Sequence, residues 1–385
     1  MASNFTVDSL PPLPEYELKP LPPLVPWASD LTLSLAAPIV TYWVLSIFFH
    51  IIDVYDVWPQ YRLHTPQELL MRNHASRWDV FRDVIIQQII ETLAGIALSY
   101  FDPEPMYGRE EYDIAVWARR IRVLEKAVPS ILGMVGINAA ALSKNWQVSA
   151  PILASVVAGG KYPMQTALIN GELTLAPAFA AWEIWVAKAL YYVVIPGLQL
   201  LGAMIVLDTW QYFWHRAMHL NKWLYTTFHS RHHRLYVPYA YGALYNHPVE
   251  GFLLDTLGSG VAYLVMGLST RQSIIFFGIS SAKTVDDHCG YKLPWDPFQR
   301  MSSNNAAYHD IHHQSWGIKT NFSQPWFTFW DAYMGTMWQG EIKSKYERQA
   351  IAANGKWLAA QKGISEPEHM KLEGEEDAGM RASGR

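Results

Sequence analysis

Three groups of histidines in the second half of the chain have spacings that suit metal binding. In His215-Arg-Ala-Met-His219 the two rings are four residues apart, so in a helix they share one face. The other two groups, His229-Ser-Arg-His232-His233 and His309-Asp-Ile-His312-His313, share the pattern His-x-x-His-His. We expect one histidine of each adjacent pair to serve a different metal ion from its neighbour. Eight ligands are too many for one ion and suit two ions in one pocket.

The residue types predict which metal these groups hold. Imidazole suits zinc, copper, iron and nickel, but a structural zinc site usually includes cysteine, and Cys289 is the only cysteine. A zinc peptidase is a poor fit, because Arg216 stands where the His-Glu-x-x-His motif needs glutamate. A haem protein with two histidine ligands would need far fewer histidines. An almost purely nitrogen ligand set favours two iron ions that bind dioxygen and oxidise an unactivated C–H bond.

Four further residues are candidates for the same site. His288, in Asp286-Asp-His-Cys-Gly-Tyr291, follows an apolar segment and precedes a glycine turn, so we predict a ninth metal ligand. His247, in Asn246-His-Pro-Val-Glu250, is a candidate metal ligand or a residue that contacts the ligands without binding the metal. The alternative is a helix cap. Asp208 and Asp287 are candidates to bind metal or to orient a ligating histidine, although capping or solvation explains them equally well. No catalytic residue beyond the metal ligands is predicted, and the pattern identifies no substrate-binding residue.

The composition indicates a membrane protein. Half of the 385 residues are hydrophobic and only 17% are charged, against about 25% in soluble domains. The 17 Trp and 21 Tyr are typical of chains at bilayer interfaces, while a mean hydropathy of zero requires substantial polar parts. The net charge of −4 gives no reason to expect nucleic acid binding.

Apolar runs predict an all-α, multi-span membrane helical bundle with a cytosolic, histidine-rich di-metal cap. The first span covers 31–52, and the arginines that follow it place the chain after it in the cytosol. The run 84–101 contains Glu91 and is marginal, so a full crossing and a re-entrant or interfacial helix both stay open. The remaining runs are 131–158, a helical hairpin or two short helices; 178–207, a strong segment; and 252–268 with 272–282, a helical hairpin.

These features divide the chain into four parts. Residues 1–30 form a Pro-rich, extended N-terminal arm, and residues 31–177 form an N-terminal membrane region. Residues 178–340 form the catalytic domain. Residues 341–385 form a polar C-terminal tail, partly disordered from Gly363 onward.

The three histidine groups in this order, with the two motifs around His247 and His288 between the second and third, resemble the fatty acid hydroxylase/sterol desaturase superfamily over about 200–340. The stretch from His312 to Asp331 resembles fungal sphinganine C4-hydroxylases in particular. So does the run from Phe49 to Pro66, which extends the resemblance to most of the chain.

The resemblance implies a multi-pass enzyme of the endoplasmic reticulum membrane with its active site facing the cytosol. It implies hydroxylation at carbon 4 of sphinganine or dihydroceramide, with dioxygen and with electrons from NAD(P)H through cytochrome b5 and its reductase. It carries the role of iron ligand to His215, His219, His229, His232, His233, His309, His312 and His313, and also to His288. The alternatives are a sterol desaturase or sterol C4-methyl oxidase on the same scaffold, and a non-catalytic lipid-binding membrane protein.

Overall fold

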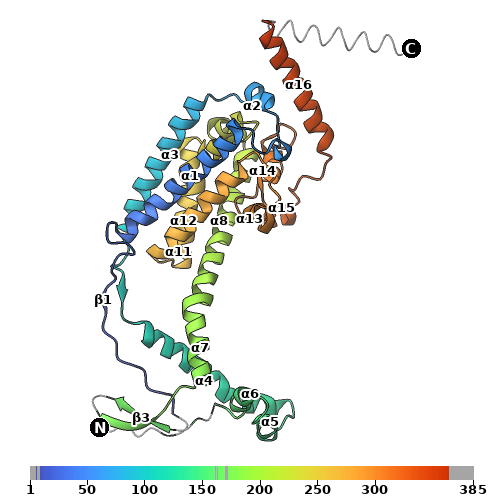
Figure 1. Ribbon diagram of the computed structural model, residues 1–385. Helices are drawn as coiled ribbons and strands as arrows, with labels where there is room; N and C mark the ends of the chain where they lie inside the picture. Colours follow the sequence, from blue (N-terminus) through green and yellow to red (C-terminus); the bar gives the residue numbers. More distant parts are fainter. Residues whose placement is uncertain (1–5, 7–8, 161, 163, 170–171, 364–385) are drawn as a thin grey trace. The chain divides into compact units, whose positions relative to one another are not determined.

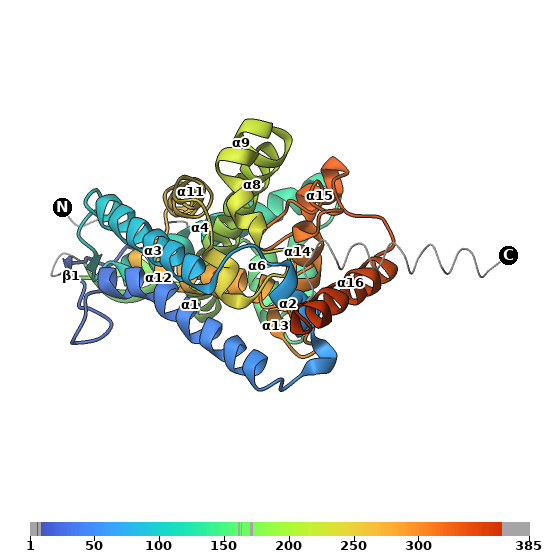
Figure 2. The same ribbon diagram turned by 90° about the horizontal axis from the view of Figure 1, so that it is seen from above.

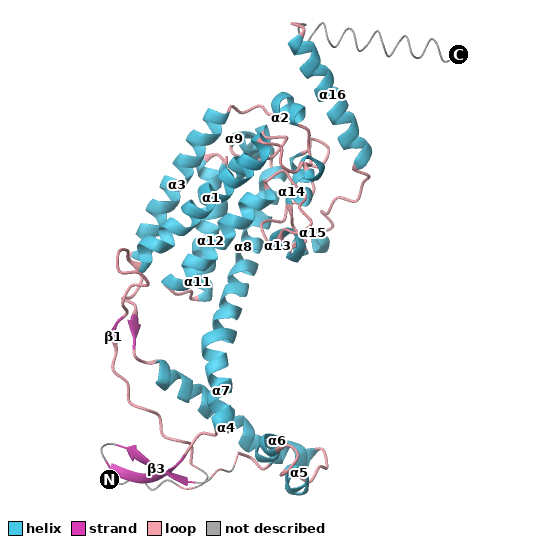
Figure 3. Ribbon diagram, viewed as in Figure 1, coloured by secondary structure: helices cyan, strands magenta, loops and turns pink. Residues whose placement is uncertain are grey.

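The computed structural model describes residues 6, 9–160, 162, 164–169 and 172–363. Helices make up most of them, as the cyan ribbon in Figure 3 shows, so the predicted all-α class is confirmed. The chain forms two compact units: one contains residues 1–23 and 103–199, and the other contains residues 24–102 and 200–385. The second unit carries all the histidines that the sequence predicts to bind metal.

Long helices form the body of the second unit. They are α1 (Asp30–Val54), α3 (Arg77–Ser99), α11 (Leu257–Met266), α12 (Thr270–Asp287) and the end of α8 (Ile195–Leu220). Helices α1 and α12 lie side by side in both views (Figures 1 and 2). The hydroxyls of Ser34 and Ser273 are 2.6 Å apart between these helices, and Ser281 Oγ donates to the carbonyl of Pro38 at 2.8 Å. These polar contacts fix the register of the two helices.

Local sequence signals explain where these helices begin and end. Capping boxes start α2 (Pro66–Arg72), α3 and α12, with the side chains of Thr65, Ser76 and Ser269 at their N-caps. Gly267, with φ of 58°, ends α11 in the left-handed conformation that glycine adopts without strain. The turn from Gly267 to Ser269 therefore produces the predicted helical hairpin of α11 and α12.

Short helices and loops carry the polar end of the second unit. They are η1 (Pro59–Tyr61), α9 (Lys222–Thr227), η3 (His229–Arg234), η4 (Ala240–Leu244), α10 (Pro248–Gly251), the π-helical η5 (Phe252–Thr256), α13 (Pro297–Met301), α14 (Ala306–His313), α15 (Phe329–Met334) and α16 (Lys343–Gln361). A buried cluster that includes Tyr42, Phe49, Val285 and Tyr291 joins α1 to the chain after α12. Burial of this cluster holds the short elements on the long helices.

The first unit contains the remaining helices and two small antiparallel sheets. Its elements are β1 (Lys19–Pro20), β2 (Met106–Tyr107), α4 (Glu110–Met134), α5 (Ala139–Trp146), α6 (Pro151–Val157), β3 (Met164–Ile169), β4 (Glu172–Pro177), α7 (Ala181–Ala189), the π-helical η2 (Leu190–Val194) and the start of α8. Strand β1 pairs with β2, and β3 pairs with β4. A buried ion pair between Arg122 and Glu183, with Nε to Oε1 at 2.6 Å, joins α4 to α7.

The helices confirm several of the predicted apolar segments. Among the described residues, three helical stretches are long and apolar enough to cross a membrane: Asp30–Val54, Ala181–Leu220 and Pro248–Met266. A fourth crossing is possible if α4 and α5, which are bent by 117°, form one broken span. The run 131–158 becomes the end of α4 and the short helices α5 and α6. The run 84–101 lies mainly in α3, which is not among the candidate spans.

Two segments, residues 164–177 and residues 341–385, remain to be compared with the sequence. The hairpin of β3 and β4 was not predicted, although Asn170-Gly171 between two alternating runs is a hairpin signal in the sequence. Part of the polar C-terminal tail forms α16, and the predicted disorder beyond Gly363 lies outside the described residues.

Candidate metal centre

Nine buried histidines form two compact groups in the second unit. Within each group, one ring nitrogen from each residue lies within 4.8 Å of the others. The first group is His215, His219, His229, His233 and His312; the second is His232, His288, His309 and His313. These are the nine histidines that the sequence singles out as ligands, and their role as ligands stays a prediction.

Four separate elements bring the rings together. The last two turns of α8 carry His215 and His219, and η3 carries the second motif. His288 is the C-cap of α12, and α14 carries the third motif. The adjacent histidines separate: His233 and His312 face the first group, whereas His232 and His313 face the second. Each His-x-x-His-His motif thus contributes to both groups.

Backbone carbonyls fix the orientation of most of these rings through Nδ1. His215 Nδ1 donates to the carbonyl of Phe322 at 2.8 Å, and His312 Nδ1 donates to that of Thr320 at 2.7 Å. The same kind of bond holds His232, His288 and His313, at 3.2, 2.8 and 2.9 Å. A ring that donates through Nδ1 presents the unprotonated Nε2 to its group when it is neutral.

The Nε2 atoms face one another at short distances. His229 Nε2 lies 2.7 Å from His219 Nε2 and 3.1 Å from His215 Nε2. In the second group, His309 Nε2 lies 3.0 Å from His288 Nε2. Burial lowers the pKa of His229 and that of His232 to about 3, so both rings are neutral at pH 7. Neutral rings that direct lone pairs at a common point are stabilised by a cation there, so the donor set fits one metal ion in each group.

Three further candidates from the sequence have other hydrogen-bond partners, and their role at the metal centre stays a prediction. His247 is the N-cap of α10, where its Nδ1 accepts from the amide of Val249 at 3.2 Å. Asp208 accepts from the amides of Trp326 and Phe327, and Asp287 pairs with the buried Lys283. Among the described residues, none of the three forms a hydrogen bond with a histidine of the two groups. Asp208 and Asp287 instead satisfy buried donors, as buried polar groups ordinarily do, whereas His247 caps a helix at a more exposed position.

A carboxylate that was not predicted from the sequence holds one of the histidines. Glu250, only 1% exposed, accepts a hydrogen bond from Nδ1 of His229. A carboxylate behind a ligating histidine fixes its tautomer and raises its basicity. Glu250 ends the motif Asn246-His-Pro-Val-Glu250, so the signal was present, but the sequence alone drew attention to His247 instead.

A second polar network contacts α14 at Asp310 and supports this helix. Asp310 accepts from Nε2 of His64 at 2.9 Å, and Nδ1 of His64 contacts Glu68 at 3.0 Å. Burial alone would lower the pKa of His64, but the carboxylates of Asp310 and Glu68 outweigh burial and raise this pKa to about 9. A protonated His64 therefore holds Asp310, and with it the helix turn between His309 and His312, against α2.

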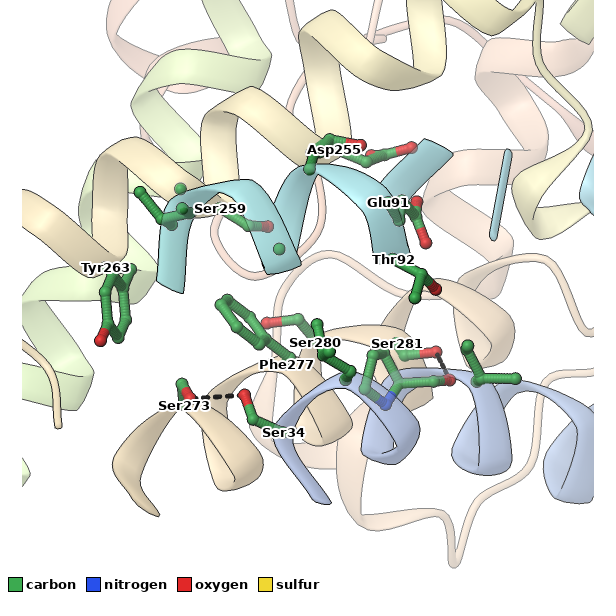
Figure 4. Close-up of a pocket in the computed structure, with 18 of the residues that line it drawn as sticks. Ser34, Glu91, Thr92, Asp255, Ser259, Tyr263, Ser273, Phe277, Ser280 and Ser281 are labelled. Atoms are coloured by element: carbon green, nitrogen blue, oxygen red, sulfur yellow. Dashed lines mark hydrogen bonds between the residues drawn. The ribbon is translucent and has the colours of Figure 1, made fainter. Parts of the chain in front are cut away.

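An elongated cavity leads to the histidines through the second unit. Helices α1, α3, α11 and α12 line it, and Figure 4 shows its side chains. Gln211, Asp255, Thr284 and Pro325 line both this cavity and a smaller pocket that His229, His232, His288 and His309 also line. The cavity and the candidate metal centre are therefore adjacent.

Comparison with known proteins places this site in a family. The sequence model of the family described as fatty acid hydroxylase matches residues 200–336, which include all nine histidines. A sphingolipid C4-hydroxylase of Saccharomyces cerevisiae is 41% identical over 359 residues, which is 93% of this chain and 86% of that protein. The chain belongs to the fatty acid hydroxylase family.

Two other relatives show how far the likeness extends within the fatty acid hydroxylase family. Sphinganine C4-monooxygenase 1 of Arabidopsis thaliana is 39% identical over 80% of this chain and 88% of its own length. A protein of Oryza sativa subsp. indica named very-long-chain aldehyde decarbonylase is 36% identical over 81% of this chain and 92% of its own length. No solved structure matches the chain. Helices α1 and α3, which line the cavity, precede the fatty acid hydroxylase region but lie within the alignment with the Saccharomyces cerevisiae protein, because that alignment covers 93% of this chain.

Proposed function

We propose that this protein is a sphinganine C4-hydroxylase, a membrane monooxygenase that adds a hydroxyl group at carbon 4 of a sphingolipid long-chain base. The observation that carries the proposal is the pair of buried histidine groups beside a long cavity between apolar helices. The names of the relatives that align over most of the chain support the substrate class. The product would be phytosphingosine, or phytoceramide if the substrate is dihydroceramide.

The nine histidines would hold two iron ions, one in each group. Bound iron supplies the activation of dioxygen that cleavage of an unactivated C–H bond requires. The protein contributes position: carbonyls and Glu250 hold the rings at Nδ1, and burial of the rings excludes bulk water from the reacting carbon. No side-chain nucleophile takes part in this scheme.

We also propose the setting of the reaction. Electrons would come from NAD(P)H through cytochrome b5 and its reductase, and the protein would lie in the endoplasmic reticulum membrane with its histidines on the cytosolic side. Arg62, Arg72, Arg77 and Arg82 follow the first candidate span closely, and an excess of arginine is typical of cytosolic segments.

A second candidate has a specific observation in its favour. The relative from Oryza sativa aligns over most of the chain, and its name describes an aldehyde decarbonylase. Because one histidine scaffold can support different outcomes with different substrate poses, long-chain aldehyde chemistry is the alternative to test. Sterol oxidation and a non-catalytic lipid-binding role are the other two.

Lipid analysis of a yeast strain that lacks its own C4-hydroxylase distinguishes these functions. Expression of the chain should restore 4-hydroxylated long-chain bases, and expression of the His312→Ala variant should not. Restored hydroxylation by that variant would show that the reaction does not need the predicted ligand His312. Absence of 4-hydroxylated bases with the wild-type chain, together with alkane formation or altered methylsterols, would refute the proposal in favour of the corresponding alternative.

A further inference from the structure

Three carboxylates line the cavity beside the histidines: Glu91 of α3 and Asp255 of η5 (Figure 4), and Asp102, whose Oδ2 accepts from the hydroxyl of Tyr263 at 2.8 Å. Most of the hydroxyls that line the same cavity have partners in the protein. Thr92 Oγ1, for example, donates to the carbonyl of Gln88 at 2.7 Å, and Ser273 Oγ donates to that of Thr270 at 2.7 Å. A hydroxyl that already donates offers a ligand only its acceptor lone pairs. Because Asp102 is already bonded to Tyr263, Glu91 and Asp255 are the carboxylates that lie together in the cavity without a hydroxyl partner among the described residues.

Amide groups hold the carboxylates close together. Gln87 Nε2 donates to Glu91 Oε1 at 2.9 Å and to Asp255 Oδ2 at 3.2 Å, and Gln211 Nε2 donates to Asp255 Oδ1 at 2.9 Å. Within the described part of the chain, no lysine or arginine forms an ion pair with either carboxylate. Buried carboxylates are ordinarily paired with a cation, so this arrangement suits a ligand that brings the positive charge.

Further polar groups in the cavity point to a ligand independently. Among the described residues, the Nε2 of Gln88, the Oγ of Ser280 and the Oγ1 of Thr256 have no hydrogen-bond partner, although Gln88 is only 5% exposed and Ser280 only 9%. A buried polar group left unpaired is destabilising. A ligand with hydroxyl groups as well as a positive charge would satisfy these side chains as well as the carboxylates.

The position of the carboxylates sets the orientation of such a ligand. Asp255 lines both the cavity and the pocket with His229 and His288, so the charged end lies near the candidate metal centre. Along α12 the cavity extends from Thr284 to Thr270, which is roughly 20 Å at the rise of an α-helix. The part of the cavity that runs away from the candidate metal centre is therefore long and suits an extended apolar tail.

We propose that Glu91 and Asp255 bind the ammonium group of a free long-chain base and so make the free base, not its N-acyl form, the preferred substrate. The inference rests on the proposed function. In such a base the nitrogen is on carbon 2, two carbons from the hydroxylated carbon, so a carboxylate beside the histidines contacts the ammonium while carbon 4 faces the rings. N-acylation replaces the ammonium with a neutral amide and adds a second chain, which removes the charge that the carboxylates recognise.

The test compares two substrates in one enzyme preparation. Sphinganine and a short-chain N-acyl sphinganine are supplied in turn to membranes containing the wild type, Glu91→Gln, Asp255→Asn, or the exposed control Glu347→Gln. We expect each cavity variant to raise the KM for sphinganine roughly tenfold or more, as loss of a charge-assisted hydrogen bond does, with little change for the N-acyl substrate. The charge-conserving Glu91→Asp should recover part of the loss.

The ratio between the substrates separates a folding defect from a recognition defect, because a folding defect lowers both rates equally. Iron content per chain provides a second check on folding. The inference would be overturned if the wild type hydroxylates sphinganine while the variants lose activity on both substrates in the same proportion, or lose activity on neither. That result would leave the proposed function standing. A wild type that hydroxylates neither substrate would instead refute the proposed function.

Discussion

Nδ1 of His229 donates a hydrogen bond to the buried carboxylate of Glu250. This carboxylate is the only acidic side chain that holds a histidine of the two groups among the described residues. We expect Glu250→Ala to lower both iron per chain and hydroxylase activity by about 10–100-fold, because the partner of a ligating histidine sets its tautomer and basicity. Metal analysis of purified protein beside an activity assay measures both. Full iron content and activity in Glu250→Ala would show that His229 needs no such support.

His312 and His247 allow a matched comparison of a predicted metal ligand with a helix cap. His312 belongs to the first group, and its buried Nε2 has no hydrogen-bond partner among the described residues, whereas His247 caps α10 outside both groups. We predict that His312→Ala lowers activity roughly 100-fold or more. His247→Ala should keep its iron and its activity while losing about 1 kcal/mol of stability with the cap, as a thermal unfolding series would show. Equal loss of iron in both variants would contradict the geometry.

The network around His64 predicts a dependence of stability on pH. The pKa of His64 is raised from 6.5 to about 9 in the folded protein, so the protonated ring stabilises the fold fully below pH 6.5 and this contribution is lost as pH rises through 9. The contribution is on the order of 3 kcal/mol. Unfolding temperatures of the wild type and His64→Gln should therefore differ most below pH 6.5 and converge above pH 9. A difference in unfolding temperature that widens as pH rises would contradict stabilisation by ion pairs of the protonated His64.

The cavity predicts a limit on chain length. Gly260 of α11 lines it, and a Cβ added there would have its nearest neighbour, Leu98 Cδ2, at 3.9 Å, so a larger side chain has room to enter the cavity. Gly260→Phe should raise the KM for long bases by roughly tenfold while shorter bases remain good substrates. Gly260→Ala, which adds only the Cβ, serves as the control and should behave as the wild type. Uniform effects on all chain lengths would mean that the tail does not pass this glycine.

Local geometry explains why the histidine groups could be predicted from sequence. Rings four residues apart, such as those of His215 and His219, share a helix face and fall in one group, and adjacent residues diverge. Rings three residues apart, such as those of His229 and His232, fall in different groups, which the spacing does not predict. The assignment of His233 to one group and His232 to the other follows from this rule. The apolar runs predicted the long helices for the same reason, because length and composition are properties of the segment itself.

Partners from distant parts of the chain could not be predicted. Asp208 lies two turns before His215 on the same helix, yet its carboxylate faces the amides of Trp326 and Phe327, which the fold brings from over a hundred residues away. Glu91 illustrates the same limit. In the sequence it only made the run 84–101 marginal as a membrane span, whereas in the fold it faces a cavity and shares Gln87 with Asp255.

The central claim is that two buried groups of histidines hold iron that hydroxylates a lipid. Iron measured in the purified protein together with formation of 4-hydroxylated sphinganine tests it most directly. We predict about two iron ions per chain, loss of hydroxylation when a chelator removes them, and recovery when ferrous iron is restored. A preparation that forms 4-hydroxylated sphinganine at full rate without iron would contradict the claim.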